Sequence, residues 1–345
     1  MATRSPSFAL HSMSRTASAG TAQGVRGRAR ALGHRVVARA DAKADARAAS
    51  ATRAVCVITG GARGLGYHLA RALVARSCAV VLASRDGARA ETASRTLGAA
   101  CAFARCDVGE TEDVEALGRR ARETAERLDV DDVYWINAAG AVTKNAPLCD
   151  VDAREISAVV RANLLGPLLG ARTCERLARE TSKRVVVFNF GFSDWGANLS
   201  KSAATHKSTK TGLSALTKAL NAEVRAMSPP IRCEFHQLSP GLALTRLLLG
   251  NGNANPISKR VFNALAEEPS VIADALVDRM LALPEGSTTP VEYLTPLEAA
   301  RRVFDELPRI VTGSGGRHFD ANGDRVRTSS DVRYDDDGVE LLPFE

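Results

Sequence analysis

The stretch ATHKSTKTGLSALTKAL (204–220) places an imidazole and an ammonium group where a helix is expected to begin. A helix starting near Thr205 would hold His206 and Lys210 in its first two turns, where the macrodipole disfavours cations. The two residues are four apart, so they share one helical face. The nearby ammonium disfavours a second positive charge, so we expect His206 to be neutral near pH 7. A neutral imidazole can donate an N–H hydrogen bond and polarise a carbonyl group.

A second group of residues has the spacing of a nucleotide-binding turn. In TGGARGLG (59–66) the glycines follow a Gly-x-x-x-Gly-x-Gly pattern, which permits a tight turn with a pyrophosphate on the helix N-terminus. Arg85 lies nineteen residues past Gly66, where an acidic residue would bind the ribose of NAD. An arginine there suits the 2′-phosphate of NADPH, although it is also typical of a solvated strand end. The expected cofactor contacts here are Gly60, Arg63, Gly64, Leu65, Gly66, Ser84 and Arg85.

These side chains require a scaffold that brings separate strand ends together. From residue 54, apolar strand-like runs alternate with amphipathic helical stretches, and the runs span 54–59, 79–84, 102–108, 132–137, 184–190 and 231–238. This alternation predicts an α/β fold with a doubly wound parallel sheet and helices on both faces. The third strand is expected to end in Asp107 and the fourth in Asn137, at the edge where α/β ligands bind.

The domain boundaries follow changes in composition and rhythm. We expect one domain over 54–312, with a helical insertion at about 250–283 that breaks the alternation. The segment 313–345 is rich in Gly, Asp and Arg and is expected to be an irregular tail. The seven cysteines are scattered without a Cys-x-x-Cys or a nearby His pair, so no metal site is expected.

The charge of the chain is concentrated in its first 40 residues. Seven of the 46 Lys and Arg lie there with no acidic residue, which leaves 39 basic against 39 acidic residues in the remainder. The excess therefore gives no basic nucleic-acid-binding domain. An Arg-rich, Ser-rich and acid-free leader is typical of a transit peptide, with a disordered tail as the alternative. We expect a plastid transit peptide at 1–40 and an Ala-rich linker at 41–53.

Five motifs together resemble the short-chain dehydrogenase/reductase family in order and spacing. They are TGGARGLG, CDV, NAAG, RANLLGP and LSPGLALT, and the resemblance covers residues 54 to about 250. It implies a seven-stranded Rossmann-type sheet, a nicotinamide cofactor, and hydride transfer to or from a carbonyl or alcohol. The roles it implies are adenine contact for Asp107, cofactor support for Asn137, Ala138 and Gly140, a proton-relay water at Asn163, ribose contact for Lys210, and nicotinamide contact for Pro240 and Gly241.

The resemblance fails at one position of the opening stretch. The family has Tyr-x-x-x-Lys there, and this chain matches the lysine but has His206 in place of the tyrosine. Three interpretations remain: catalysis by His206, lost activity with the cofactor site retained, or a proton donor from elsewhere. The serine partner implied by the family is Ser193, with Ser200 and Ser202 as competitors and a plain turn serine as the alternative.

The region after residue 240 resembles a subgroup, the plastid chlorophyll(ide) b reductases, through TRLLL, the helical insertion and YLTP. This implies NADPH-dependent reduction of the 7-formyl group of chlorophyll b or chlorophyllide b in the chloroplast. The alternatives are a catalytically lapsed NADPH-binding partner of an active paralogue, or a plastid reductase of a keto-lipid or quinone. Expected partners are the small-molecule substrate, a paralogue or second copy, and a light-harvesting complex. No run of 18 apolar residues occurs, so membrane contact is expected to be peripheral only.

Overall fold

The computed structural model describes residues 52–193, 203–250, 255–326, 333–335 and 339–345. All of them belong to the compact unit Ala48–Glu345. The expected transit peptide, most of the expected linker, and the competing serines Ser200 and Ser202 lie outside the described residues.

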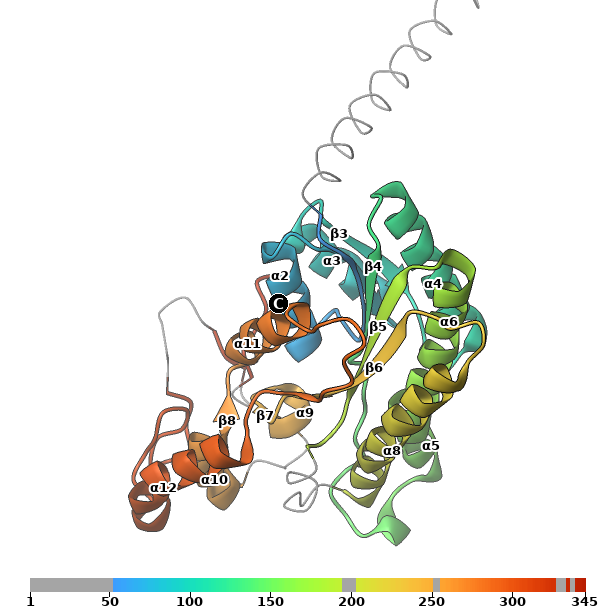
Figure 1. Cartoon of the computed structure of the whole chain (residues 1–345). Coiled ribbons are helices and arrows are strands. Elements are labelled where there is room, and N and C mark those ends of the chain that lie inside the picture. The colour runs from blue at the N-terminus through green and yellow to red at the C-terminus, as the bar shows by residue number, and fades with distance from the viewer. Residues whose placement is uncertain (1–51, 194–202, 251–254, 327–332, 336–338) are drawn as a thin grey trace, which may run out of the picture. The chain divides into compact units, whose positions relative to one another are not determined.

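The unit is built on a seven-stranded sheet in which every pair of neighbouring strands is parallel, in the order β3-β2-β1-β4-β5-β6-β9 (Figure 1). Its central strands are continuous apolar runs because helices cover both faces. The strands are β1 Val55–Thr59, β2 Ala79–Ser84, β3 Cys101–Arg105, β4 Asp132–Asn137, β5 Arg184–Phe190, β6 Cys233–Ser239 and β9 Val291–Glu292. The expected doubly wound α/β fold is therefore confirmed.

Two apolar layers hold the helices on the sheet (Figure 1). On one face pack α2 Gly64–Ala75, α3 Gly87–Leu97 and α11 Pro269–Leu281, with Leu69, Leu73 and Leu276 fully buried. On the other face pack α4 Thr111–Arg127, α6 Gly166–Thr181 and α8 Ala204–Ala226. This right-handed winding brings the carboxyl ends of β1, β4 and β5 to one edge, together with the first turn of α8.

Two elements near this edge differ from the sequence expectation. The third strand ends at Arg105 and not at Asp107, because the Asp107 N–H donates to the Asp113 carboxylate of α4 (2.8 Å). The long helical stretch expected at 151–180 is divided into α5 Ala153–Val160, a π-helical turn η2 Arg161–Leu165, and α6. A 3₁₀ turn, η1 Leu148–Asp150, precedes α5.

Beyond β6 the chain leaves the sheet and returns to it. The elements in this region are β7 Leu242–Ala243, α9 Arg246–Leu249, α10 Pro256–Leu265 and β8 Ala266–Glu267, followed by α11, β9 and α12 Pro296–Thr312. The strands β7 and β8 pair with each other in a small second sheet, while α11 packs on α2 of the main sheet.

The segment after α12 contains only isolated bridges among its described residues, Phe319 with Arg325 and Tyr334 with Glu340. It is nevertheless packed on the unit, because Phe319 is 1% exposed and Leu342 is 2% exposed. The C-terminal residues lie near α2 and α11 (Figure 1).

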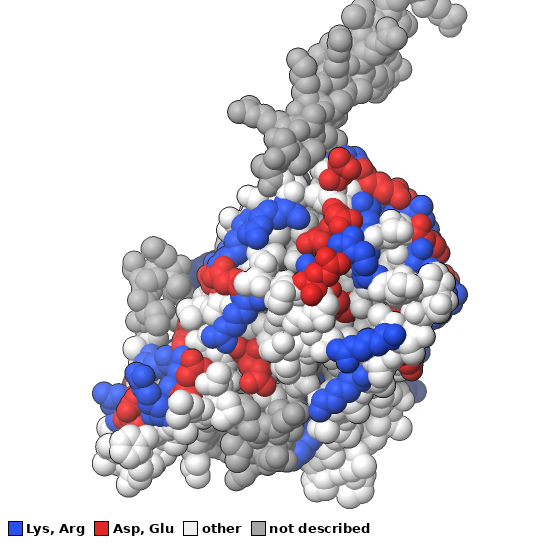
Figure 2. Space-filling view, in the orientation of Figure 1, with Lys and Arg blue, Asp and Glu red and all other residues white. Residues whose placement is uncertain are grey.

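Charged side chains of both signs are interspersed over the face seen in Figure 2. Within the described part of the chain, no helix is both long and apolar enough to cross a membrane. Six of the seven cysteines are buried as free thiols, and the described residues contain no group of His, Cys, Asp and Glu suited to a metal ion.

Candidate functional site

The glycine turn after β1 is packed directly against the turn after β4. Gly60 has φ +69°, and a Cβ there would lie 2.7 Å from the Ala139 Cα, closer than real contacts allow. A Cβ on Gly66 would overlap the Gly60 carbonyl oxygen. The Ala139 N–H donates to Thr59 Oγ1 (3.2 Å), which fastens the two turns together. Glycine is therefore required at Gly60 and Gly66 for the backbone to adopt this shape.

The N-terminus of α2 emerges from this turn without a side-chain cap. Arg63 is the N-cap residue in extended conformation, and its side chain makes no capping hydrogen bond. The first-turn N–H groups, beginning at Gly64 (φ +51°), are therefore without a side-chain cap. Leu65 is half-buried against the core and fixes the start of the helix. Such an uncapped N-terminus suits an anion such as a pyrophosphate.

Guanidinium groups gather beside this helix end. Burial lowers the pKa of Arg63, and the positive charges of Arg89, Arg246 and Arg85 lower it further. Arg85 directly follows β2, as predicted, and the adjacent Ser84 Oγ accepts the Asp86 N–H (3.2 Å) at the start of α3. The four arginines (Arg63, Arg85, Arg89 and Arg246) are called the arginine cluster below. Mutual repulsion of its members is relieved by binding an anion.

Asn137, which is expected to support the cofactor, lies at the end of β4 in a buried chain of hydrogen-bonded side chains. Asn137 Oδ1 accepts the indole N–H of Trp135 (2.9 Å), and Asn137 Nδ2 donates to Asn189 Oδ1 (2.9 Å). Asn189 Nδ2 in turn donates to Thr217 Oγ1 on α8 (3.1 Å). The chain ties β4 to β5 and α8. Ala138 follows Asn137 directly, and its N–H donates to the Ile136 carbonyl in the turn that leads to Gly140.

Asn163 is fixed by the π-helical turn and is completely buried. Its Oδ1 accepts the Ala141 N–H (2.8 Å), and its Nδ2 donates to the Ala141 carbonyl (2.9 Å) and to Thr209 Oγ1 (3.1 Å). A π-helical turn of this kind often marks a functional site, because the inserted residue changes which side chains face inward. Asn163 thereby connects the turn after β4 with α8.

Lys210 reaches the same place from α8. Its Nζ donates to the Phe190 carbonyl at the end of β5 (2.8 Å). A Cβ placed on Gly140 would lie 3.4 Å from Asn163 Oδ1 and 3.9 Å from Lys210 Nζ. Burial lowers the pKa of Lys210 from 10.5 to about 8. The structure thus places Gly140 beside both Asn163 and Lys210.

His206 lies one turn before Lys210 in the first turn of α8, which begins at Ala204. Its ring stacks on the ring of Phe192, with centroids 5.6 Å apart and an interplanar angle of 20°. Burial, and secondarily the charge of Lys210, lower the pKa of His206 from 6.5 to about 4. The imidazole is therefore neutral near pH 7 and has one N–H to donate.

The remaining predicted residues lie around this centre. Ser193 follows Phe192, is 4% exposed, and donates its N–H to Ser239 Oγ (3.1 Å). Pro240 and Gly241 follow β6, and Gly241 has φ +67°. Asp107 lies beyond the end of β3, where its Oδ1 accepts the Gly109 N–H (2.9 Å) and fixes the loop toward α4.

Several residues of the site are not apparent from motif spacing. No sequence motif marks Phe192 or Thr205. Phe192 stacks on His206, and Thr205 Oγ1 forms a hydrogen bond with Thr143 Oγ1 (2.9 Å). Arg246 follows Thr245, whose Cγ2 would lie 3.5 Å from a Cβ on Gly64, so the chain beyond Gly241 returns over the glycine turn. Arg89 could have been found as the residue four positions past Arg85 at the start of an expected helix.

Comparisons with known proteins agree with this geometry. The family model described as short chain dehydrogenase matches residues 54–252. The chain is 31% identical over 259 residues to "Chlorophyll(ide) b reductase NOL, chloroplastic" of Arabidopsis thaliana, which covers 73% of each protein. It is 31% identical over 300 residues to "Probable chlorophyll(ide) b reductase NYC1, chloroplastic" of Oryza sativa subsp. japonica, covering 80% of this chain and 57% of that protein.

Solved structures share the fold. An alcohol dehydrogenase of Thermococcus sibiricus complexed with 5-hydroxy-NADP superposes with a TM-score of 0.54 at 26% identity, covering 71% of this chain and 99% of that one. A 3-ketoacyl-(acyl-carrier-protein) reductase of Brucella melitensis complexed with NADH superposes with a TM-score of 0.58 at 22% identity, covering 70% and 96%. With the family model matching more than half of its length, the chain belongs to the short-chain dehydrogenase/reductase family of oxidoreductases.

Proposed function

We propose that the protein is an NADPH-dependent carbonyl reductase that reduces the 7-formyl group of chlorophyll b or chlorophyllide b to a hydroxymethyl group. The observation that carries the proposal is the meeting of Lys210 and Asn163 beside Gly140, with His206 one turn before Lys210 on α8, close to a glycine turn with an arginine cluster. The choice of substrate is supported by the two relatives, whose names describe a chlorophyll(ide) b reductase and a probable one.

The described residues fit a phosphorylated dinucleotide. A Cβ at Gly60 or Gly66 would overlap neighbouring backbone, so only glycine allows the turn to pack this closely. The side chain of Arg63 does not cap α2, so the N–H groups at its N-terminus can face a phosphate. The arginine cluster offers the 2′-phosphate of NADPH several guanidinium groups, and guanidinium is well suited to bind phosphate. NADH lacks that phosphate and would leave these guanidinium groups without a phosphate partner.

The chain's own residues would then act on the carbonyl group. NADPH, when bound, supplies the hydride to the aldehyde carbon. The neutral ring of His206 donates its N–H to the aldehyde oxygen and stabilises the negative charge that develops there. Lys210, with a pKa of about 8, is largely protonated near pH 7 and would supply the proton that converts the alkoxide into the hydroxymethyl group. Its bond to the Phe190 carbonyl fixes its position. The two hydrogen bonds between Asn163 and Ala141 fix the position of the turn after β4.

The test is turnover of chlorophyllide b with NADPH by the purified protein, followed by absorbance and product chromatography. We expect Lys210→Ala to lower kcat by roughly 100-fold or more, as for the loss of a proton-transfer or positioning group. His206→Gln removes the ring and is expected to lower kcat while leaving NADPH affinity nearly unchanged. A wild-type protein that reduces a plastid quinone or keto-lipid but not chlorophyllide b would contradict the proposed substrate.

A second function is favoured by one observation. The stack on Phe192 and the low pKa of about 4 leave His206 without a proton to transfer near pH 7. We therefore also consider a catalytically lapsed NADPH-binding partner of an active paralogue. In that case the wild type binds NADPH without turnover, and only His206→Tyr is active. Turnover by the wild type contradicts this second function.

The proposal extends to the cellular setting. The relatives named above carry the description chloroplastic, and we propose a plastid location on the stromal side, with peripheral thylakoid contact. A light-harvesting complex that presents the pigment, and a paralogue or second copy of this chain, are the proposed partners. Import of the full chain into isolated chloroplasts tests the location.

A further inference from the structure

The arginine cluster already has a carboxylate among its cations. Arg89 Nη1 donates to Glu345 Oε1, and the Glu345 side chain is 24% exposed. Arg63 is affected by the same carboxylate, whose charge opposes the effect of the neighbouring arginines on the Arg63 pKa. Glu345 thus stands in for an anion at the place where Arg63 and Arg85 suit a 2′-phosphate.

Two apolar anchors place Glu345 there. The ring of Phe344 packs edge-on against Tyr67 of α2, with centroids 5.4 Å apart and an interplanar angle of 74°. Leu342 is 2% exposed in the same core, and its N–H donates to Glu345 Oε2 (3.2 Å). A few residues earlier, Glu340 Oε2 lies 3.6 Å from His68 Nε2. The segment 339–345 is therefore fitted along α2 and ends with its carboxylate on α3.

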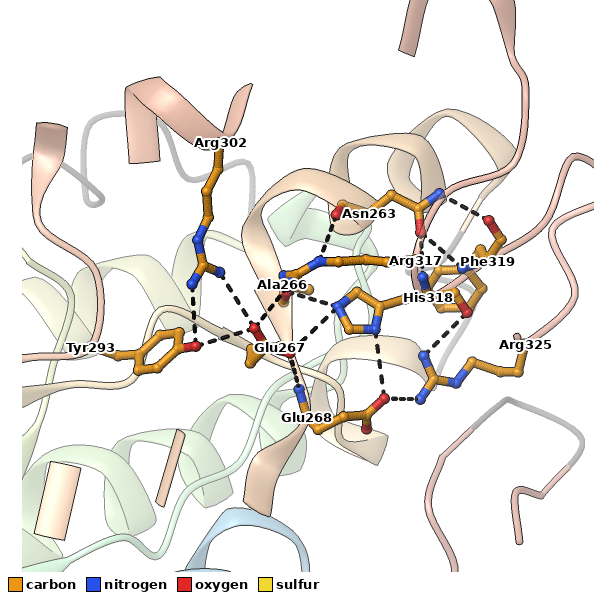
Figure 3. A network of polar contacts seen from close by, with 10 residues as sticks. All are labelled: Asn263, Ala266, Glu267, Glu268, Tyr293, Arg302, Arg317, His318, Phe319 and Arg325. Carbon is orange, nitrogen blue, oxygen red and sulfur yellow. Dashed lines mark hydrogen bonds and ion pairs between the residues drawn. The ribbon is translucent and has the colours of Figure 1, made fainter. Parts of the chain in front are cut away.

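The other end of this tail is fastened to the segment that follows α10 by the network in Figure 3. Arg317 Nη1 donates to Glu267 Oε2 (2.9 Å), and Arg325 Nη2 donates to Glu268 Oε1 (2.5 Å). Both carboxylates belong to the segment that follows α10. Between the two ends, Asp335 pairs with Arg246 of the cluster (2.5 Å). The tail therefore runs from the insertion to the cofactor side.

We propose that the side chain of Glu345 occupies the arginine cluster in place of the cofactor's 2′-phosphate, and that NADPH, but not NADH, displaces it and loosens the segment 339–345. This rests on the proposed cofactor. A phosphate group with nearly two negative charges and three acceptor oxygens binds guanidinium more strongly than a carboxylate does. Glu345 and the 2′-phosphate compete for the same cations, so Glu345 weakens the binding of NADPH. NADH has no 2′-phosphate, so Glu345 leaves its affinity nearly unchanged.

The first test measures the Kd of NADPH and NADH for the full chain and two variants by titration calorimetry. Glu345→Gln is expected to tighten NADPH about tenfold, the effect of removing one like charge at close range in a partly buried site, and to change NADH less than about twofold. The matched control is Glu91→Gln, which removes one carboxylate charge from α3, where Glu91 pairs with the exposed Arg95. It is expected to leave both constants unchanged.

The second test needs no variant. Hydrogen–deuterium exchange of peptides covering 339–345 should rise in wild-type protein on addition of NADPH and stay constant with NADH. Equal NADPH affinity of the wild type and Glu345→Gln, weaker binding by Glu345→Gln, or exchange that does not respond to NADPH would overturn the inference while leaving the cofactor proposal intact. A wild type that binds no NADPH overturns both.

Discussion

In the proposed reaction, His206 acts under constraints that differ from those on a phenol. Its ring stacks on Phe192 and is affected by the charge of Lys210, in the first turn of a helix whose dipole also disfavours a cation. These effects all lower the pKa of His206, so the ring stays neutral and contributes a hydrogen bond instead of a labile proton. In the proposed reaction, the group that polarises the carbonyl, His206, is thus distinct from the group that holds the transferable proton, Lys210.

The first prediction concerns the protonation of His206. Titration by NMR of histidine-labelled protein should show a His206 midpoint near 4, against 6.5 for an unperturbed histidine, with the signal assigned by its absence in His206→Gln. Because the folded-state pKa is depressed, the contribution of His206 to stability is complete above about pH 6.5 and is lost as the pH falls toward 4. Lys210→Met should raise the midpoint only partly, because burial is the larger cause. A midpoint at or above 6.5 would contradict the assignment.

At the scale of elements, the site depends on the contact between two turns. The glycine turn meets the turn after β4 so closely that no side chain fits between them. The contact also sets where α2 begins, and hence where its uncapped N-terminus and Arg63 lie. Elements from three parts of the chain thereby share one edge: β1 with α2, β4 with its turn, and α8.

The second prediction distinguishes the effect of this contact on the free energy of unfolding from the effect of backbone strain. Gly60→Ala places a Cβ 2.7 Å from the Ala139 Cα at φ +69°, whereas Gly98→Ala meets nothing within 4 Å at φ +88°. Urea unfolding should show a loss of about 1–3 kcal/mol for Gly98→Ala from strain alone, and a larger loss for Gly60→Ala. Only Gly60→Ala should also abolish NADPH binding. Equal losses in the two variants would show that the contact with Ala139 is dispensable.

The third prediction concerns the join between β5 and β6. Arg184 Nη2 donates to Glu234 Oε2 (2.9 Å) and Arg184 Nε to Oε1 (3.2 Å) in a buried pair. Burial raises the pKa of Glu234, but the neighbouring His236 ring (Nε2 3.8 Å from Oε2) and hydrogen bonds from Arg184 and the Gly286 N–H outweigh it and lower the pKa from 4.5 to about 2. The stabilisation is therefore complete above about pH 4.5 and is lost as the pH falls through 2.

Glu234→Gln should accordingly lower the free energy of unfolding at pH 7 by about 3 kcal/mol, the lower end for a broken buried pair. The reason is that it removes the hydrogen-bonded partner of the buried Arg184 and leaves only the ion pair with Asp132 (3.5 Å). The control is Glu285→Gln, which removes a half-exposed partner of Arg232 and should cost less than about 1 kcal/mol. Urea midpoints between pH 7 and pH 3.5 measure both. A deficit of Glu234→Gln that stays constant across this range would contradict the shifted pKa.

The sequence predicted the elements that repeat a pattern and missed those held by single contacts. Apolar runs and helical periods located six strands and the fold, and the turn spacing located Gly60 to Gly66 and Arg85, because such signals are local. The strand β9 has only two residues, too few for a period. The contact of Arg89 with Glu345 spans 256 residues and depends on Phe344 packing on Tyr67, which no spacing encodes.

At the scale of the whole molecule, the net positive charge is distributed unevenly along the sequence. The first 40 residues contain seven arginines and no acid, whereas the remainder is balanced at 39 basic and 39 acidic residues. The leader's composition suits recognition by an organellar import system.

The fourth prediction tests that role. Full-length protein made in vitro should enter isolated chloroplasts, resist external protease, and be shortened by about 40 residues, as expected for a cleaved transit peptide. Replacing the leader arginines by glutamine should abolish import, whereas replacing them by lysine should preserve it, because lysine keeps the positive charge. The positions changed are Arg4, Arg15, Arg26, Arg28, Arg30, Arg35 and Arg39. Import of the glutamine variant at the wild-type rate, or uptake by mitochondria in place of chloroplasts, would contradict a plastid leader and remove the support that location gives to a chlorophyll substrate.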